Sequence, residues 1–390
     1  MHHLYALGVK VGQVRSCAPM RITFILPTVN LSGGIRVVAI HAGMLAARGH
    51  QVVLVSPPAM EPSIREKVRS LLKGNGWPTV EPNPRSHLDG TGLDHRVLDR
   101  WRPVTNDDVP HADVIVATWW ETAEWVAALS PDKGAKTYFV QGHEVFSHLP
   151  VARCHATYRL RMHKIVVARW LQELMRTDYG DTVVDVVPNS VDHEQFHAEV
   201  RGKQPAPTVG FLYSTAPTKG LEVVLEALRL VRERVPGLRV ASFGSESPTK
   251  AFGLPSGAAF QLSPPQESIR ELYSSCDAWL TASRREGFNL PAMEAMACRT
   301  PVVSTRSGWP EEAIVSGENG VLVEVDDAAA LARGVEWVRS RTEGEWQSLS
   351  RRAYETTARS SWEDSSRRFE EALLHACRRS RAGEIDGQCG

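Results

Sequence analysis

Several features that would assign this chain to a common class of protein are absent. Its 390 residues carry 45 basic and 45 acidic side chains, so the net charge is zero and gives no sign of nucleic-acid binding. No apolar run approaches the ~18 residues that cross a membrane, and residues 1–19 lack the uninterrupted apolar core of a signal peptide. These absences predict a cytoplasmic globular protein.

Cysteine patterns and short binding motifs are missing as well. The six cysteines show no CxxC spacing, which argues against a disulfide framework or structural zinc and predicts free thiols at Cys17, Cys154, Cys276, Cys298, Cys377 and Cys389. The glycine-containing turn after the first predicted strand is not GxGxxG, so the dinucleotide fingerprint is absent. No Asp-x-Asp pair stands at a suitable strand end, so we predict no metal site.

What the chain contains is an alternation of short apolar runs with helical patterns, in two series, which indicates βα units with buried parallel strands. The predicted strands are Ile22–Leu26, Gln51–Val55, Asp113–Ala117, Thr137–Val140, Lys164–Ala168 and Val183–Val187, then Thr208–Leu212, Leu238–Phe243, Ala259–Leu262, Ala278–Thr281, Pro301–Ser304 and Gly320–Glu324. A Pro-rich stretch at 201–207 separates the series. We therefore predict an α/β fold of two doubly wound sheets, facing across one cleft beyond the carboxyl ends of their strands.

The expected organisation has four parts. Residues 1–19 form an extension before Met20, where the functional chain starts; 20–200 form the first domain, 201–360 the second, and 361–390 a final helix with a loose tail. The helical pattern Trp362–Cys377 follows Ser361 as N-cap and presents Trp362, Phe369, Leu373 and Ala376 on one face, so it should pack. Residues 60–110 show weak periodicity and are assigned to irregular connections, with room for short helices.

The most informative motif is a pair of glutamates, Glu286 and Glu294, eight positions apart. Glu286 lies in a turn after a predicted strand, and Glu294 lies in the helix that follows. Asn289 is the expected N-cap and Pro291 suits the first helical turn, so unpaired N–H groups of residues 288–291 should point outward and attract phosphate. Glycoside hydrolases also use paired carboxylates, but a turn and a following helix need not direct two carboxylates at one bond.

Three further junctions attract attention. Gly33 and Gly34 open a helix after the first strand, where backbone amides can approach a ligand oxygen closely, although a tight turn explains them equally well. Lys219 follows the first strand of the second series and could neutralise a diphosphate leaving group, although considered singly it reads as a solvated lysine. The segment Val187–Phe196, taken in isolation, has the pattern of a Pro/Asn turn.

Together these motifs resemble the retaining glycosyltransferases of family 4, also described as glycosyl transferases group 1. The resemblance runs from about Met20 to about residue 378 and rests on Ser-Gly-Gly near the start, Pro-Asn-Ser-Val-Asp at the junction, Lys219-Gly220, the glutamate pair and Ser-Gly-Glu-Asn-Gly-Val-Leu-Val from Ser316. It implies the GT-B fold, with the nucleotide-sugar donor held mainly by the second domain, the acceptor facing the first, and the last helix crossing back to the first domain.

The resemblance also implies roles for individual residues. Glu286 would contact hydroxyls of the donor sugar, Glu294 the ribose and Lys219 the diphosphate, while the stretch 259–263 would bracket the base. The implied donor-binding set is Gly33, Gly34, Ser214, Lys219, Leu262, Arg285, Glu286, Phe288, Asn289, Leu290, Glu294 and Glu312. The implied catalytic set is Glu286, Lys219 and His143.

The sequence departs from the family pattern in two places. The arginine common five residues before the lysine is Ser214 here, so another cation, such as Arg36, Arg284 or Arg285, would serve the diphosphate. The family histidine near the reacting sugar falls in Gln141-Gly-His143-Glu144, where either Gln141 or His143 could fill the place. A neutral His143 could handle the acceptor proton with Glu144 orienting it, and a solvated loop histidine is the alternative. Trp119 and Trp120 could stack on a sugar, but core packing explains them better.

These features predict a metal-independent, cofactor-free retaining glycosyltransferase that uses a nucleoside-diphosphate sugar and an acceptor hydroxyl. Front-face attack, in which the leaving phosphate takes the acceptor proton, needs no enzymatic nucleophile. The alternatives are a GT-B epimerase or hydrolase, and a non-catalytic sugar-nucleotide-binding protein. The Arg-rich stretch 153–169 permits peripheral membrane contact, although a solvated helix face is the simpler interpretation. Base, sugar, acceptor, linkage and oligomeric state stay open.

Overall fold

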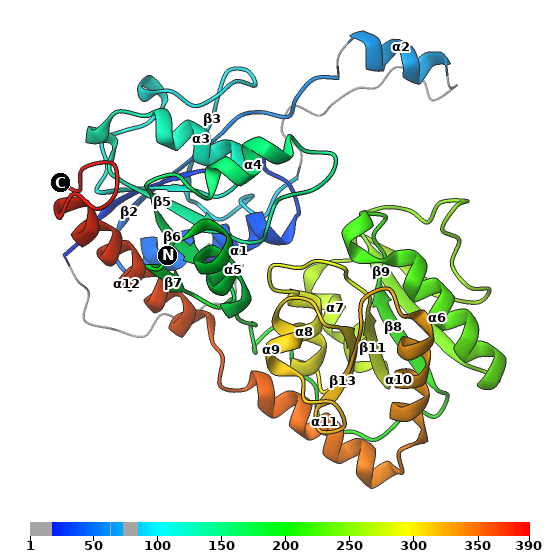
Figure 1. Ribbon diagram of the computed structural model, residues 1–390. Coiled ribbons are helices and arrows are strands. Elements are labelled where there is room, and N and C mark those ends of the chain that lie inside the picture. Colours follow the sequence, from blue (N-terminus) through cyan, green and yellow to red (C-terminus); the bar gives the residue numbers. More distant parts are fainter. Residues whose placement is uncertain (1–17, 63, 73–84) are drawn as a thin grey trace. The chain divides into compact units, whose positions relative to one another are not determined.

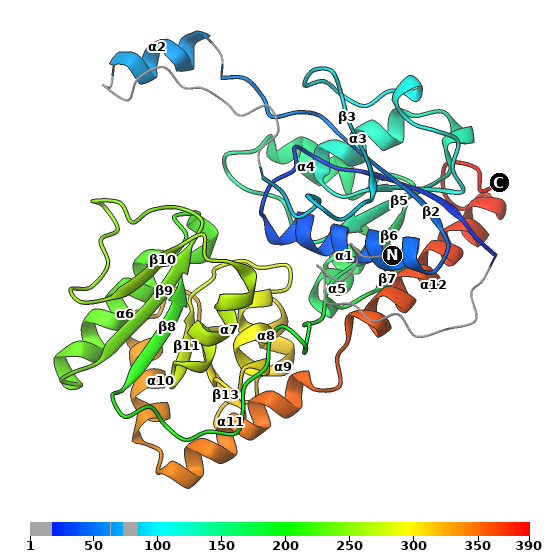
Figure 2. The same ribbon diagram turned by 180° about the vertical axis from the view of Figure 1, so that it is seen from behind.

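The computed structural model describes residues 18–62, 64–72 and 85–390, which divide into two compact units (Figures 1 and 2). Unit 1 holds the described residues up to Val167, together with Leu171–Val187 and Ser366–Gly390. Unit 2 holds Ala168–Trp170 and Pro188–Ser365. The chain thus leaves unit 1 after Val187 and returns to it within its last helix.

Unit 1 is built on a seven-stranded parallel sheet in the order β3-β2-β1-β4-β5-β6-β7. The strands are β1 Arg21–Ile25, β2 Gln51–Ser56, β3 Asp94–Val97, β4 Val114–Ala117, β5 Ala135–Val140, β6 His163–Val166 and β7 Val184–Val186. The helices are α1 Gly33–Ala47, α2 Ile64–Leu72, α3 Trp120–Ala128, α4 Val151–Thr157, α5 Arg169–Tyr179 and α12 Trp362–Arg381, with short 3-10 turns η2 Asn106–Asp108 and η3 Pro131–Lys133. Strands β4, β5 and β6 are buried throughout, as expected for parallel strands covered on both faces.

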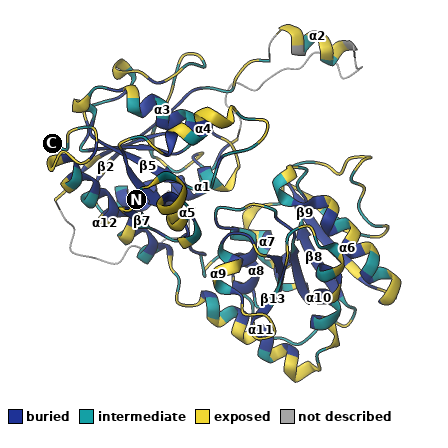
Figure 3. Cartoon of the chain, in the orientation of Figure 1, coloured by how far each residue is buried: buried dark blue, intermediate teal, exposed yellow. Residues whose placement is uncertain are grey.

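Unit 2 is built on a six-stranded parallel sheet in the order β10-β9-β8-β11-β12-β13. The strands are β8 Thr208–Leu212, β9 Arg239–Gly244, β10 Ala259–Leu262, β11 Ala278–Thr281, β12 Val302–Thr305 and β13 Gly320–Val323. The helices are α6 Leu221–Arg234, α7 Gln266–Ser274, α8 Leu290–Ala297, α9 Trp309–Ala313, α10 Ala328–Ser340 and α11 Glu343–Thr357, with η4 Pro217–Lys219. Figure 3 shows the buried residues concentrated in the strands and on the inner helix faces of each unit.

The two parallel sheets confirm the predicted fold class. Every predicted strand is present to within two residues, whereas β3 lies in the region assigned to irregular connections. Its sequence, Asp-His-Arg-Val, is largely exposed at the edge of the sheet, so it lacks the apolar signature of the other strands. The expected extension 1–19 lies almost wholly outside the described residues.

The last helix packs on unit 1. Phe369 on α12 lies against Phe24 on β1, His41 on α1 and Phe139 on β5, with ring centroids 6.0, 4.5 and 4.9 Å away. The predicted apolar face of this helix is buried, which confirms that it crosses back to the first sheet. Glu370 also forms an ion pair with Arg48 and a hydrogen bond with the His50 imidazole.

Two expectations about the C-terminus are wrong. The tail is held rather than loose, because Lys136 donates its backbone N–H to the Asp386 carbonyl at 2.9 Å and the side chain of Ile385 is buried. Cys377 and Cys389 form a disulfide, whereas Cys154, Cys276 and Cys298 are free and buried. The free-thiol prediction fails for this pair because the turn after α12 brings together two cysteines that are twelve positions apart.

None of the helices among the described residues is long and apolar enough to cross a membrane.

His41 makes the stability of unit 1 sensitive to acid. It is fully buried beside Phe139 and Phe369, and this burial, with a smaller contribution from the charge of Arg48, lowers the pKa of His41 to about 3. The unfolded chain would bind a proton near the ordinary pKa of 6.5, so folding loses stability as the pH falls from 6.5 towards 3. We expect the free energy of unfolding to fall between pH 7 and 5 by about 2 kcal/mol more in the wild type than in His41→Phe.

Urea denaturation at the two pH values measures this difference. His148→Phe, at an exposed histidine, is the control and should keep the wild-type pH dependence. Equal pH dependence in His41→Phe and the wild type would show that His41 does not carry the effect.

Candidate functional site

The sheet of unit 2 has a topological switch point, at which the order in which the chain adds strands reverses. Strand β8 lies between β9 and β11, so the chain first extends the sheet to one side and then to the other. In such sheets ligands bind beyond the carboxyl ends of the strands at this switch point. The loops that follow β8, β9, β11 and β12 all reach that edge, because the strands are parallel.

Lys219 and Glu286 meet across the switch point. Lys219 Nζ, in the loop after β8, donates to Glu286 Oε1, in the loop after β11, at 2.6 Å. Ser283 Oγ donates to the same oxygen at 2.7 Å. The side chains of Lys219 and Glu286 are 30% and 12% exposed, and a cavity of about 20 Å³ beside them has room for about one water molecule. Two predicted site residues, 67 positions apart, thus form one charged centre.

The helix start after Glu286 is built as expected. Asn289 caps α8, since its side chain accepts a hydrogen bond from the Ala292 N–H, and Pro291 occupies the first turn. Asn289 adopts a left-handed conformation with φ 83°, and its Nδ2 donates to Thr281 Oγ1 at 3.1 Å. The cap and the anchor to β11 together fix the direction in which the residues before α8 present their N–H groups.

Two glycines permit the close approach of these loops. Gly220 has φ 61°, and a Cβ there would lie 2.2 Å from the Ala282 carbonyl oxygen. Gly308 has φ 70°, and a Cβ there would lie 2.7 Å from the Phe288 carbonyl oxygen and 2.9 Å from Glu286 Cβ. Only glycine combines this backbone conformation with this proximity. Gly308 therefore allows the loop that carries Glu286 to pack closely against the start of α9.

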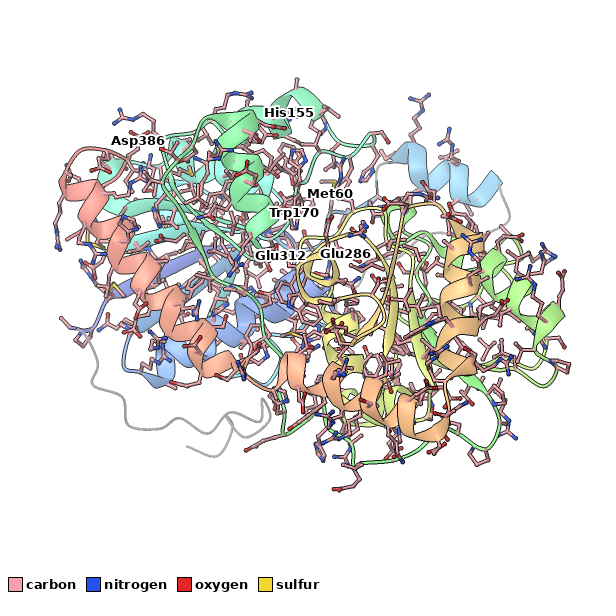
Figure 4. The ribbon with its side chains drawn as sticks, turned by 60° about the horizontal axis from the view of Figure 1, so that its bottom comes forward. Met60, His155, Trp170, Glu286, Glu312 and Asp386 are labelled. Atoms are coloured by element: carbon pink, nitrogen blue, oxygen red, sulfur yellow. A yellow bond between two sulfur atoms is a disulfide. The ribbon has the colours of Figure 1, made fainter. Side chains whose placement is uncertain are left out.

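Aromatic residues brace the same loop. The Trp309 N–H donates to the Phe288 carbonyl at 2.7 Å, and the two rings stack with centroids 5.8 Å apart. Trp170, which belongs to unit 2, donates its indole N–H to the Gly287 carbonyl at 3.0 Å and its backbone N–H to Glu312 Oε1 at 3.1 Å. Figure 4 labels Trp170, Glu286 and Glu312 close together. Nothing in the sequence pattern around Trp170 marked it for the site.

Three further predicted donor residues, Glu294, Leu262 and Arg285, belong to unit 2 but differ in their surroundings. Glu294 is buried on α8, and its Oε2 accepts a hydrogen bond from Tyr273 Oη at 2.8 Å. Leu262 ends β10 and is 53% exposed, and Arg285 is exposed in the loop after β11. Contacts of Glu294 with a ribose and of Leu262 with a base stay predictions.

Arg284 does not suit the place of the missing arginine. Its guanidinium forms 2.6 Å ion pairs with Glu222 and Asp326 and donates to the Pro217 carbonyl at 2.8 Å. These contacts neutralise its charge and hold the turn that carries Lys219. Arg36, on α1 of unit 1, and exposed Arg285 stay candidates for this role.

Unit 1 has its own switch point, between β1 and β4, where Gly33 and Gly34 open α1. Gln141 lies next to this turn, with its amide 3.5 Å from where a Cβ of Gly34 would be. His143 instead forms a 2.6 Å hydrogen bond between its Nε2 and Tyr179 Oη. The structure thus brings Gln141 to the glycine turn and His143 to an aromatic group.

The prediction that Glu144 orients His143 is wrong. The Glu144 carboxylate accepts hydrogen bonds from the Trp120 N–H at 2.8 Å and from Tyr138 Oη at 3.1 Å. Burial raises the pKa of Glu144 well above its ordinary value, although these two hydrogen bonds lower it in part. Trp120 itself is buried, so it packs in the core rather than presenting a stacking surface.

One group of possible metal ligands occurs in the described parts of the chain, and it belongs to unit 1. His163 Nε2 and His375 Nδ1 both lie within 3.0 Å of Asp185 Oδ2. Arg379 Nη1 lies 3.2 Å from His163 Nδ1, a geometry in which that nitrogen accepts and the Nε2–H donates to Asp185. This arrangement fits a hydrogen-bonded contact between α12 and the sheet better than a metal centre, because a metal would need the lone pair of His163 Nε2, which here carries the proton.

Comparisons with known proteins agree with this geometry. Residues 192–356 match the family model described as glycosyl transferases group 1. A GDP-mannose-dependent alpha-(1-6)-phosphatidylinositol monomannoside mannosyltransferase of Mycolicibacterium smegmatis is 28% identical over 254 residues, which are 57% of this chain and 66% of that protein. A D-inositol 3-phosphate glycosyltransferase of Mycobacterium marinum is 32% identical over 222 residues, 50% of this chain and 45% of that protein. The matched part thus spans no more than two thirds of either relative.

Solved structures show the same architecture over most of the chain. HepE of Anabaena in complex with UDP-glucose has a TM-score of 0.67 at 16% identity, covering 91% of this chain and 100% of that chain. Sucrose-phosphate synthase of Thermosynechococcus elongatus has a TM-score of 0.69 at 16% identity, covering 93% and 99%. At this identity the likeness concerns the fold, which is GT-B. Residues 192–356 thus match the glycosyl transferases group 1, and they lie in a chain whose two parallel-sheet units have the GT-B fold.

Proposed function

We propose that this protein is a retaining glycosyltransferase that moves a sugar from a nucleoside diphosphate to an acceptor hydroxyl. The observation that carries the proposal is the Lys219–Glu286 pair at the β8/β11 switch point, a cation and a carboxylate side by side where a nucleotide sugar would bind. The ammonium suits a diphosphate, and the carboxylate suits sugar hydroxyls. The family match and the relatives named as glycosyltransferases support the same class of reaction.

The proposed chemistry needs no nucleophile from the protein. The acceptor oxygen forms a bond to the anomeric carbon on the face that the diphosphate leaves, the bond from that carbon to the phosphate oxygen breaks, and the acceptor proton passes to the leaving phosphate. Lys219 and the N–H groups before α8 would stabilise the charge that develops on the diphosphate. On the acceptor side, Gln141 and His143 are the candidates.

A donor screen followed by a transfer assay tests the proposal. We expect one of UDP, GDP, dTDP and ADP to raise the melting temperature, because a ligand bound only by the folded state stabilises it. The matching nucleotide sugar should then yield a glycoside of unchanged anomeric configuration by NMR, at a rate that EDTA does not alter. Donor turnover without any acceptor would favour an epimerase or hydrolase, and binding without turnover across a broad acceptor panel would favour a non-catalytic protein.

We further propose that the acceptor is presented at an anionic membrane surface through α2. Ile64, Val68 and Leu71 share one face of this helix and are exposed, and Arg65 and Arg69 lie beside that face. The Arg-rich stretch 153–169 is less suited, because Arg153 pairs with Glu124 and Arg159 lies over the Tyr179 ring. A phosphatidylinositol-derived acceptor is named for the Mycolicibacterium smegmatis relative, which supports a lipid-linked acceptor here.

Vesicle co-sedimentation tests this surface. We expect binding to phosphatidylglycerol vesicles over phosphatidylcholine vesicles. The double change Arg65→Gln with Arg69→Gln should weaken this binding about thirtyfold, since each basic residue near such a surface contributes roughly 1 kcal/mol. The matched control is Arg351→Gln with Arg352→Gln on the exposed face of α11. Equal binding by both double variants would refute a role for α2.

Trp170 is expected to position the Glu286 loop. Trp170→Phe keeps an aromatic ring but removes the indole N–H that holds the Gly287 carbonyl. Loss of one neutral hydrogen bond predicts about a fivefold fall in kcat/KM for the donor. Steady-state kinetics should show this fall with little change in melting temperature. Trp101→Phe, in unit 1, is the control, and an unchanged kcat/KM in Trp170→Phe would argue against the positioning role.

A further inference from the structure

A second carboxylate contact lies beside the β8/β11 switch point, between the loops that follow β8 and β9. Thr215 donates its backbone N–H to Glu246 Oε1 at 2.5 Å and its Oγ–H to Glu246 Oε2 at 2.8 Å. Both residues are half-buried, so the contact is neither sealed in the core nor loosely solvated. The two donors converge on the two oxygens of one anion.

The backbone fixes these loops against each other. The Tyr213 N–H continues the β8–β9 ladder by donating to the Phe243 carbonyl at 2.8 Å. Gly244 allows the close approach, since a Cβ there would lie 2.4 Å from the Tyr213 carbonyl oxygen. Thr215 thus follows an ordered strand end, and the direction of its N–H is set by the sheet rather than by Glu246.

The position of Thr215 links it to the donor site. It follows Ser214, which stands where the family pattern has an arginine for the diphosphate, and it precedes Lys219 by four positions. Lys219 is also held by a carboxylate, that of Glu286. In the structure, therefore, the cation and the neutral donors on this loop each bind an internal carboxylate.

The charge of Glu246 conflicts with a bound diphosphate. Phosphate oxygens are acceptors like carboxylate oxygens, so the Thr215 N–H and Oγ–H could bind either group. Two anions at one pair of donors would repel each other, and burial from water strengthens that repulsion. A diphosphate that takes these donors must displace the Glu246 side chain.

We propose that the Thr215 N–H and Oγ–H form a neutral binding site for the donor diphosphate, which Glu246 occupies as an internal anion until a nucleotide displaces it. This inference rests on the proposed function and deepens it, because it supplies the phosphate contact that Ser214 lacks. Glu246 then lowers the affinity for nucleotide, whereas Thr215 raises it.

Both effects, the lowered affinity due to Glu246 and the raised affinity due to Thr215, can be measured by calorimetric titration with the nucleoside diphosphate that the donor screen identifies. Glu246→Gln removes the competing charge and should tighten binding about fivefold, with the gain shrinking as salt is raised. Thr215→Val keeps the shape but removes the hydroxyl and should weaken binding about fivefold, while Thr215→Ser restores it. Glu271→Gln, at an exposed position on α7, is the matched control for loss of one negative charge.

Each result decides the question. Weaker or unchanged binding by Glu246→Gln would overturn the competition, weaker binding meaning that Glu246 itself contacts the nucleotide. Equal binding by Thr215→Val and the wild type would overturn the role of the hydroxyl. Failure of the proposed function is separate, because wild-type binding without any transfer would leave the diphosphate site intact. No binding of any nucleoside diphosphate by the wild type would overturn both.

Discussion

Replacing Glu286 with glutamine is expected to lower kcat by at least about 100-fold, comparable to removing one preorganised electrostatic contact from a transition state. Glutamine has nearly the same size but no charge, so it weakens the hydrogen bond to a donor hydroxyl and no longer offsets the positive charge that builds on the sugar ring as the diphosphate leaves. Initial rates at saturating donor and acceptor measure the effect, since kcat isolates the step after binding.

Stability separates this chemical role from a structural one. The glutamine oxygen can still accept the hydrogen bonds from Lys219 and Ser283, so the melting temperature of Glu286→Gln should stay close to that of the wild type. Glu311→Gln, at an exposed glutamate on α9, is the control and should keep full activity. An active Glu286→Gln enzyme, or one that unfolds, would contradict the role assigned to Glu286.

The fold was predictable because most of its strands are buried on both faces. Parallel strands covered by helices need continuous apolar runs, and runs such as Val-Ile-Val-Ala in β4 show in the sequence without any tertiary information. The edge strand β3 is exposed and charged, so its place is set by pairing with β2 rather than by its own residues. The Cys377–Cys389 disulfide could not be predicted from the sequence, because it depends on the turn after α12 and not on a spacing motif.

The parts of the candidate site that depend on contacts between residues close in sequence were predictable. Asn289 caps the helix three residues before the N–H that it binds, so the cap is written in adjacent residues. Trp170 binds a carbonyl 117 positions away, and Glu246 binds Thr215 across 31 positions. His143 looked suitable for the acceptor side by sequence, but Tyr179, which binds it, lies 36 positions further on. Partners set by tertiary packing leave no periodic or motif signal.

The Lys219–Glu286 contact implies that each residue masks the other before the donor binds. A 2.6 Å pair must open for the ammonium to reach a diphosphate and for the carboxylate to reach a hydroxyl. A bound donor would give each group a new partner, the diphosphate for the ammonium and a sugar hydroxyl for the carboxylate, so neither charge would be left unpaired. Binding energy of the donor can therefore replace the pair without a large penalty.

Lys219→Met is accordingly expected to lower kcat/KM for the donor about 100- to 1,000-fold, because it removes the ammonium that meets Glu286 at the switch point. Methionine keeps the length of the side chain and its packing. Lys219→Arg keeps the charge and should retain more activity than Lys219→Met, although its planar fork does not reproduce a point charge.

The combination of Lys219→Met with Glu286→Gln provides the sharpest measurement. If both residues act on one donor at one centre, the double variant should lose less activity than the product of the two single losses, since removing either partner already disables the centre. Losses that multiply independently would mean that the two residues serve separate steps. Activity of Lys219→Met within a few-fold of the wild type would show that Lys219 does not bind the diphosphate. Thr215 and the N–H groups at the start of α8 would then be the remaining candidates for that contact.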